Sequence, residues 1–305
     1  MSILEIIKWA TGIKLWELII NAIKGGGSSN GSAGTLWKCV MFFPHKICGT
    51  NVTPSWPGNK GVDSPLEFAY CHGQSWENDF RQNCYKQIQA LGGDTIIFIS
   101  ERLYGRDVPH LELQMFLTNR AHPVDGHRMN DAENEVVKAR KYGVNRWIID
   151  LFNDDSTLIS VTQYEDYIKQ MGECYSWASD DEVAVMVCLE TDERFKTVGS
   201  VTQIIKWIRQ YFPGKRIIVG SANSDFLKAV RAANADIEMW AETDGHPFTL
   251  NMSNADKYID KLKGLIKAGK TWAGEYGDGQ NAAVAYVSEK AIDAGCAGIG
   301  CFKKG

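Results

Sequence analysis

Val183-Ala-Val-Met-Val-Cys-Leu-Glu190 is a short apolar run that ends in a glutamate just before a loop. Thr271-Trp-Ala-Gly-Glu275-Tyr-Gly-Asp278 repeats the arrangement further along the chain, with Glu275 where its apolar part ends. Counted along the sequence, these runs are the fourth and the seventh of eight. A strand buried on both faces of a parallel sheet has such an uninterrupted apolar run. The two runs therefore predict strands whose carboxyl ends carry glutamates.

The eight apolar runs alternate with amphipathic stretches of helical period. The expected strands are residues 36–43, 95–100, 146–152, 183–189, 216–220, 237–241, 272–274 and 298–302. The expected helices are residues 76–91, 131–142, 162–178, 201–212, 225–233, 254–268 and 281–294. This alternation predicts an α/β fold, a (β/α)8 TIM barrel over residues 35–305. An open doubly wound sheet is disfavoured because the Gly-rich phosphate turn that usually follows its first strand is absent.

Residues 1–34 differ in composition from the expected barrel. Residues 1–24 form an apolar segment that predicts a helix, and residues 25–34 are a Gly/Ser-rich flexible linker. A signal peptide and a membrane span both fit poorly, because four charges interrupt the segment: Glu5, Lys8, Lys14 and Glu17. Three roles for the helix stay open. It docks on the barrel in place of a helix after the eighth strand, it forms a homo-oligomer, or it attaches the protein to a larger assembly or membrane surface.

Charge and cysteine spacing narrow the classes of partner. The net charge is −4 with no long basic run, which argues against nucleic acid. No CxxC pair and no Cys/His cluster with zinc spacing occurs, so neither a metal nor a cofactor is expected. Cys48, Cys71 and Cys84 share one loop-rich region, and the formation of a single disulfide among them stays an open alternative.

The residues expected at the carboxyl ends of the strands, where barrel enzymes have their active sites, are strongly acidic. Asp and Asn are common helix caps and turn residues, whereas Glu is favoured in neither role, so the glutamates are the stronger candidates. The expected rim comprises His45, Glu101, Arg102, Asp150, Asn153, Asp154, Asp155, Glu190, Asp192, Glu193, Asn223, Asp225, Glu242, Asp244, His246, Glu275, Tyr276, Asp278 and Phe302.

Strand alternation predicts which glutamates face the barrel axis. Glu190 shares a row with Met186 opposite a row of valines, so we expect it to point inward. Glu275 lies on the face opposite Trp272, and we expect it to point inward as well. Glu242 shares its row with Trp240, opposite an apolar row, and is expected inside only if the sixth strand bends into its loop.

Trp272-Ala-Gly-Glu275-Tyr-Gly-Asp-Gly279 resembles the strand-seven nucleophile segment of retaining glycoside hydrolases of clan A, especially family 5. The clan's acid/base glutamate lies at the end of strand four, where this chain has Glu190, and an arginine is common where Arg102 stands. The resemblance implies a glycosidase that cleaves a poly- or oligosaccharide with retention, using Glu275 as nucleophile and Glu190 as acid/base. It also implies a carbohydrate-binding cleft, to which we assign Arg102, Trp240, Glu242, His246 and Tyr276.

Two positions depart from the pattern of this clan. Leu189 stands where an asparagine usually precedes the strand-four glutamate, and Phe302 is the nearest aromatic to the usual strand-eight tryptophan. A second hypothesis is therefore a noncatalytic carbohydrate- or receptor-binding barrel, tethered to an assembly such as a virion or cell envelope. A metal-dependent hydrolase is disfavoured because only His45 and His246 lie near expected strand ends.

Overall fold

The computed structural model describes residues 36–42, 85–86, 89, 93–99, 139–152, 164–176, 178–244, 250–277 and 282–303. The strands are β1 (Trp37–Phe42), β2 (Thr95–Ile99), β3 (Arg146–Phe152), β4 (Val183–Cys188), β5 (Arg216–Ser221), β6 (Glu238–Ala241), β7 (Thr271–Tyr276) and β8 (Gly298–Lys303). The helices with described bounds are α5 (Tyr164–Cys174), α6 (Thr191–Phe195), α7 (Val198–Tyr211), α8 (Ser224–Ala233), α9 (Met252–Ile266) and α10 (Ala282–Asp293). Several expected features lie outside these residues: the N-terminal helix, its linker, the disulfide that was left open as an alternative, and the loops after the first two strands.

The strands close into a barrel in the order of the sequence, from β1 to β8 and back to β1. Every neighbouring pair is parallel, and the closing pair runs in register from Trp37 opposite Gly298 to Phe42 opposite Lys303. The predicted (β/α)8 barrel is thus confirmed, and each predicted strand lies within two residues of its observed bounds at both ends.

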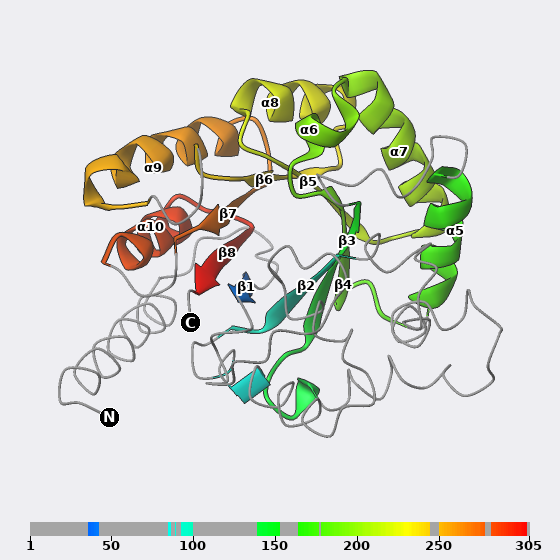
Figure 1. Cartoon of the computed structure of the whole chain (residues 1–305), viewed down its shortest axis with the longest axis horizontal. Helices are drawn as coiled ribbons and strands as arrows, with labels where there is room; N and C mark the ends of the chain where they lie inside the picture. The colour runs from blue at the N-terminus through cyan, green and yellow to red at the C-terminus, as the bar shows by residue number, and fades with distance from the viewer. Residues whose placement is uncertain are drawn as a thin grey trace, which may run out of the picture.

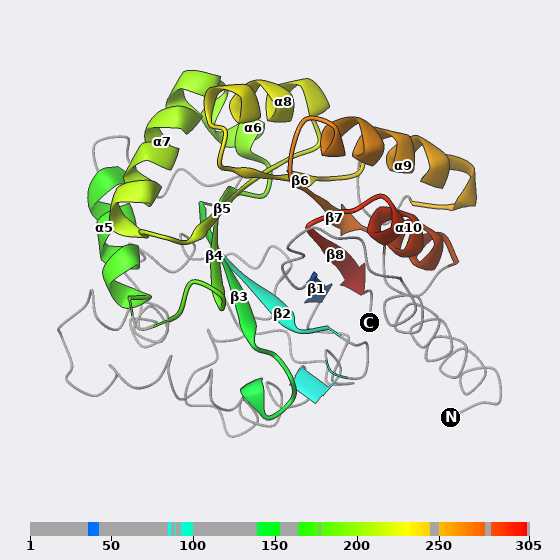
Figure 2. The same cartoon turned by 180° about the vertical axis from the view of Figure 1, so that it is seen from behind.

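The described helices lie around the outside of the strands, as Figures 1 and 2 show from opposite sides. Side-chain caps fix where several of them begin. The side chain of Thr197 accepts a hydrogen bond from the amide of Ser200 at the start of α7. The side chain of Asn223 accepts hydrogen bonds from two amides at the start of α8. Asn251 begins α9 with a reciprocal capping box. Such caps satisfy the amides that a helix leaves unpaired at its first turn.

Alternate strand residues divide the core into two clusters. The inner cluster contains strand residues only and fills the barrel; it consists of Trp37, Cys39, Ile97, Ile148, Ala184, Met186, Ile218, Trp240 and Trp272. The outer cluster joins the other strand faces, including Val185, Met239 and Ala273, to the apolar faces of the helices. The barrel is therefore a packed core and not a pore.

An ion pair and two indoles close the amino-terminal end of the barrel, which we call the barrel floor. Glu238 is 2% exposed and accepts two hydrogen bonds from the Arg216 guanidinium, at 2.9 and 2.6 Å. The indole of Trp272 donates to the same carboxylate at 2.7 Å. The guanidinium also lies over Trp37, 4.8 Å from its ring centroid. The buried carboxylate is thus matched by a cation and by a neutral donor, as its burial requires.

Candidate active site

Three glutamates lie at the carboxyl ends of described strands. Glu190 follows β4 by two residues, Glu242 directly follows β6, and Glu275 is the last residue but one of β7. Burial raises the pKa of Glu242 well above its usual range, and the negative charges of Glu275, Glu190 and Asp192 raise it further, in that order.

Glu190 occupies the position just before α6, a short helix that the sequence did not predict. Its backbone carbonyl accepts from the amides of Glu193 and Arg194, at 3.1 and 3.3 Å, while its carboxylate does not cap the helix. The side chain is half-buried. Of the row on which its placement was predicted, Ala184 and Met186 lie in the inner cluster, whereas Cys188 lies in the outer cluster, so the inward direction of Glu190 stays a prediction.

The turn that carries Glu190 is held at both ends. Thr191 is buried, and its hydroxyl donates to the carbonyl of Cys188 at 2.9 Å. The Arg194 guanidinium lies over the rings of Phe152 and Phe195, 5.7 and 5.8 Å from their centroids. Cation–π contacts of this kind fix the helix against the end of β3. The backbone at Glu190 is therefore a defined turn between β4 and α6.

Gly220 of β5 gives a test of how closely this turn is packed. A Cβ at position 220 would overlap the carbonyl oxygen of Leu189 and lie 2.7 Å from that of Cys188. We expect Gly220→Ala to lower the free energy of unfolding by about 1–3 kcal/mol, because backbone atoms must move to admit the methyl group. Urea denaturation measures the change.

Gly264→Ala is the matched control, since nothing lies within 4 Å of a Cβ at that position inside α9. Alanine there is expected to stabilise the protein by about 0.5–1 kcal/mol through the lower conformational entropy of the unfolded chain. Equal denaturation midpoints for the two variants would contradict the close packing of β5 against the turn at Glu190.

Glu275 reaches the barrel mouth through a β-bulge. Ala273 pairs with Ile299 and Tyr276 with Cys301, so Gly274 and Glu275 together stand opposite the single residue Gly300. Glu275 has a φ of 50°, in the left-handed region that non-glycine residues rarely adopt. The hydroxyl of Thr243 donates to its carbonyl at 3.4 Å. Strain of this kind persists where the surroundings fix it, and it clusters at functional sites.

The faces of β7 were predicted the wrong way round, and the inward direction of the Glu275 side chain stays a prediction. Trp272 lies in the inner cluster and Ala273 in the outer one, the reverse of the expected faces. Regular alternation would have turned Glu275 outward. The bulge inserts one extra residue, and the next side chain, that of Tyr276, lies in the outer cluster, like that of Ala273.

The parity argument against Glu242 was also wrong. Trp240 points into the barrel and Met239 and Ala241 point toward the helices, so the row of Glu242 is the inward row. Glu242 is 3% exposed, and its Oε1 atom is buried without a hydrogen-bond partner among the described residues. Its amide donates to the carbonyl of Ser221 at 3.2 Å. It is therefore an inward, buried carboxyl on a fixed backbone.

Lys261 of α9 ties together the segments around Glu242. Its ammonium donates to the carbonyl of Glu242 at 2.8 Å, to the carboxylate of Asp244 at 2.9 Å, and to the carbonyl of Ala222. Lys257 adds a second ion pair to Asp244 at 2.9 Å. Hydrogen bonds from Lys261, and then from Lys257, lower the pKa of Asp244. Asp244 is thus an anchor of the segment after β6.

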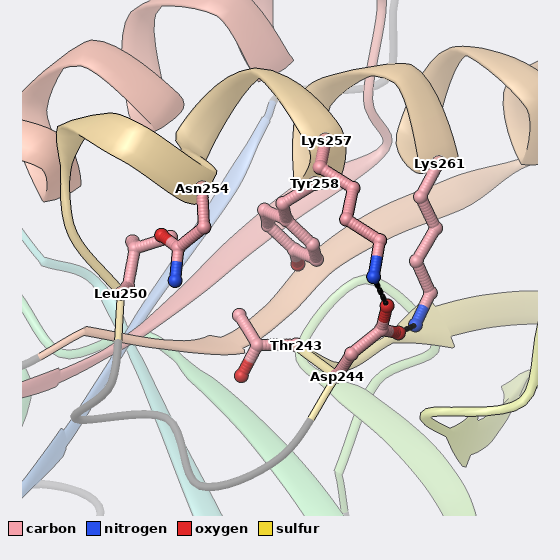
Figure 3. Close-up of a pocket in the computed structure, with 7 residues that line it drawn as sticks. All are labelled: Thr243, Asp244, Leu250, Asn254, Lys257, Tyr258 and Lys261. Atoms are coloured by element: carbon pink, nitrogen blue, oxygen red, sulfur yellow. Dashed lines mark hydrogen bonds and ion pairs between the residues drawn. The ribbon is translucent and has the colours of Figure 1, made fainter.

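A pocket of about 100 Å³ lies between α9 and the segment after β6, as Figure 3 shows. In that view both lysines point to Asp244, so the charges at the pocket wall are already paired. Beneath the wall, the buried hydroxyl of Tyr258 donates to the carbonyls of Ala241 and Gly274, at 2.5 and 3.1 Å. The pocket therefore lies beside the hydrogen bonds through which Tyr258 joins the ends of β6 and β7. Its lining is Thr243, Asp244, Leu250, Asn254, Lys257, Tyr258 and Lys261.

Two of the expected sugar contacts lie in the core. Trp240 is fully buried, and a Cβ at Gly274 or Gly300 would overlap its ring. Tyr276 is also fully buried, and its hydroxyl pairs with that of Ser288 in α10 at 2.7 Å. Trp240 fills the barrel and Tyr276 faces the helix layer, so the structure differs from the expectation that either contacts a substrate.

Of the other three expected contacts, Glu242 is the buried carboxyl described above, and Arg102 and His246 lie outside the described residues. The structure adds two residues that the sequence analysis did not assign. One is Lys261, which reads as an ordinary exposed charge on a helix. The other is Ser221, whose hydroxyl donates to Asp192 at 2.6 Å while its carbonyl accepts the amide of Glu242. These hydrogen bonds join residues that are far apart in the sequence, so no local sequence pattern predicts them.

Within the described ranges, the structure contains no group of three or more His, Cys, Asp or Glu side chains placed to hold a metal ion. None of the described helices is both long and apolar enough to cross a membrane.

Comparison of the backbone with solved structures finds the same architecture in the exo-β-1,4-mannosidase Op5Man5 from Opitutaceae bacterium strain TAV5, with a TM-score of 0.57 and 14% sequence identity. The match covers 90% of this chain and 55% of that chain, so the protein spans about half the length of the mannosidase. The likeness shows that the chain has the same (β/α)8-barrel fold as this mannosidase. The resemblance of the strand-seven segment implied this fold.

Two further matches have lower TM-scores. The β-mannanase of the blue mussel Mytilus edulis has a TM-score of 0.46 and 13% identity, over 77% of this chain and 83% of that chain. The endoglucanase Cel5A of Thermobifida fusca has a TM-score of 0.44 and 14% identity, over 72% of each chain. No protein-family model and no curated protein sequence matches the chain.

Proposed function

We propose that the protein is a retaining glycoside hydrolase with Glu275 as nucleophile and Glu190 as general acid/base. The observation that carries the proposal is the position of both glutamates at the carboxyl end of the barrel, Glu190 two residues after β4 and Glu275 as the last residue but one of β7. Barrel enzymes place their reacting groups at this end. The left-handed backbone and bulge at Glu275 add support, because such a conformation has a cost and serves to aim one side chain.

The chemistry follows from the roles of the two carboxyls. In a retaining enzyme they stand about 5–5.5 Å apart across the scissile bond. Glu275 attacks the anomeric carbon while Glu190 gives its proton to the leaving oxygen, and a glycosyl-enzyme ester forms. Glu190 then takes a proton from water, which attacks the anomeric carbon and releases Glu275. The first step needs an ionised Glu275 and a protonated Glu190, so the pKa of Glu190 must be the higher.

Arg102 and His246 are proposed to complete the cleft, Arg102 by holding Glu275 ionised and His246 by contacting the sugar. The proposed partner is therefore a carbohydrate chain lying across the carboxyl ends of the strands. Residues 1–24 are proposed as a separate unit joined to the barrel by residues 25–34.

The decisive experiment measures cleavage and binding together on the full chain. We expect new reducing ends from at least one member of a panel of plant and bacterial polysaccharides. The panel begins with β-1,4-mannan, since a mannosidase shares the fold. Proton NMR of the first product should show the same anomeric configuration as the substrate. Binding of a glycan without cleavage would instead support the noncatalytic barrel, and an inverted product would contradict the two-glutamate mechanism.

A further inference from the structure

Glu238 and Glu242 lie four residues apart on the inward row of β6 and have the same burial, at 2% and 3% exposed. Their surroundings differ. The carboxylate of Glu238 meets the guanidinium of Arg216 and the indole of Trp272. The carboxyl of Glu242 has neither partner, and its Oε1 atom is buried and unpaired among the described residues. One strand thus presents a paired glutamate at the barrel floor and an unpaired one at the mouth.

Lys261 is the positive charge that acts on the carboxyl group of Glu242, and it lowers the pKa of that group less than burial and the nearby carboxylates raise it. An ammonium group has three donors, and those of Lys261 go to the carbonyl of Glu242, the carbonyl of Ala222 and the carboxylate of Asp244. Its contact with Glu242 is therefore to the backbone and not to the carboxyl group. The other described charges that act on this carboxyl are those of Glu275, Glu190 and Asp192, all of them negative. Within the described residues, burial and three negative charges outweigh the positive charge of Lys261, so this carboxyl favours its protonated form.

The end of β6 is held against Glu275. Ala241 pairs with Ala273, which brings the next residue, Glu242, beside the bulge formed by Gly274 and Glu275. Thr243 donates to the carbonyl of Glu275, and Tyr258 joins the carbonyls of Ala241 and Gly274. Of the three carboxylates that act on Glu242, Glu275 acts most strongly. The neighbour toward which a proton on Glu242 can be directed is therefore Glu275.

We propose that Glu242 is a protonated positioning residue, whose neutral carboxyl donates a hydrogen bond to Glu275 and holds that carboxylate ionised and oriented. The role assigned to Glu275 rests on the proposed function. The proton stays on Glu242 throughout the reaction, so no covalent or proton-transfer step is added. A hydrogen bond to the ionised form of an acid favours that form. A third ionised carboxylate at this point would instead repel Glu275.

A spectroscopic experiment tests the proton without any substrate. Full-length protein labelled with ¹³C at the glutamate carboxyl carbons is titrated by NMR. At pH 7 we expect a resonance at the position of a protonated carboxyl that is absent from Glu242→Gln. The same resonance should be retained in Glu190→Gln, which removes the proposed acid, and in the control Glu193→Gln, which removes an exposed carboxylate. Full ionisation of every glutamate at pH 7 would overturn the proposal.

Stability as a function of pH gives a second readout without activity. Because the pKa of Glu242 is raised in the folded protein, only the unfolded chain releases this proton as the pH passes about 4.3. Wild-type stability therefore falls with pH from that point until the pH exceeds the folded-state pKa. Glu242→Gln has no such proton, so its denaturation midpoint should rise relative to the wild type over this interval. A constant difference between the two midpoints would count against the proton.

Kinetics separate positioning from simple packing. Glu242→Gln keeps a neutral donor and should retain turnover within about tenfold, whereas Glu242→Leu should lose about 100-fold in kcat with little change in KM, because the nucleophile is misplaced. Equal turnover of these two variants would overturn the positioning role. If the wild type cleaves no glycan, the proposed function fails, while the NMR titration still decides whether Glu242 holds a proton.

Discussion

Glu275→Gln is expected to reduce kcat by about 10⁴-fold or more, because glutamine has the shape of the nucleophile but cannot form the glycosyl-enzyme ester. A 10⁴-fold loss corresponds to about 5.4 kcal/mol of transition-state stabilisation. The amide retains the volume of the carboxyl group at the bulge, so the fold should survive. Initial rates on the best substrate of the polysaccharide panel measure the effect, and glycan affinity should change little.

Two related variants make this prediction specific. Glu193→Gln alters an exposed carboxylate in the first turn of α6 and should leave turnover unchanged. Glu190→Gln should lower turnover by about 10²–10⁴-fold on a natural glycan. It should lower it much less when the leaving group is a good one that needs no proton. A Glu275→Gln protein that still cleaves at a tenth of the wild-type rate would exclude Glu275 as nucleophile.

Glu238→Ala is expected to destabilise the protein by about 3–5 kcal/mol, although the residue is remote from the proposed chemistry. Removal of the carboxylate leaves the guanidinium of Arg216 without its counter-charge and the indole of Trp272 without its acceptor. The side chain of Arg216 is 25% exposed, so water partly solvates the unpaired guanidinium in the variant. We therefore expect a destabilisation near the lower end of this range. The midpoint of urea denaturation measures it.

The surface offers the same ion pair in a different environment. Arg209 and Asp236 also meet through two hydrogen bonds, but their side chains are 40% and 58% exposed. Asp236→Ala should therefore cost no more than about 1 kcal/mol. The double variant Arg216→Met with Glu238→Leu removes both charges of this ion pair and should recover most of the stability that Glu238→Ala loses. Similar losses for Glu238→Ala and Asp236→Ala would show that burial does not set the strength of the pair.

The barrel was predictable because its strands are buried on both faces. Runs such as Val183–Cys188 need no partner to be recognised, since length and apolar character suffice. Seven intervening amphipathic stretches then leave few topologies open. The short helix α6 escaped prediction because five residues are too few to show a helical period. Its position depends on tertiary contacts of Thr191 and Arg194.

The strand ends that carry the candidate glutamates were predictable, whereas the directions of the strand faces were not. Glu190 and Glu275 were found from strand ends alone, whereas the faces of β6 and β7 were assigned the wrong way round. The reason is that Trp240 and Trp272 fill the barrel, where the sequence analysis expected the smaller residues Ala241 and Ala273. Space for the ring of Trp240 comes from Gly274 and Gly300 on other strands, a relation that one strand's pattern does not contain. The bulge at Glu275 likewise depends on pairing with β8.

The closed barrel floor leaves one end of the barrel for both substrate entry and product release. Trp37, Trp272 and the Arg216–Glu238 pair fill the axis from below, so no sugar chain can thread through the barrel. Under the proposed function, a polysaccharide must lie across the carboxyl ends of the strands, and its fragments must depart from the side on which it arrived. Product and substrate then compete for one entrance. Accumulating product should therefore inhibit the reaction by competing with substrate for the open end of the barrel.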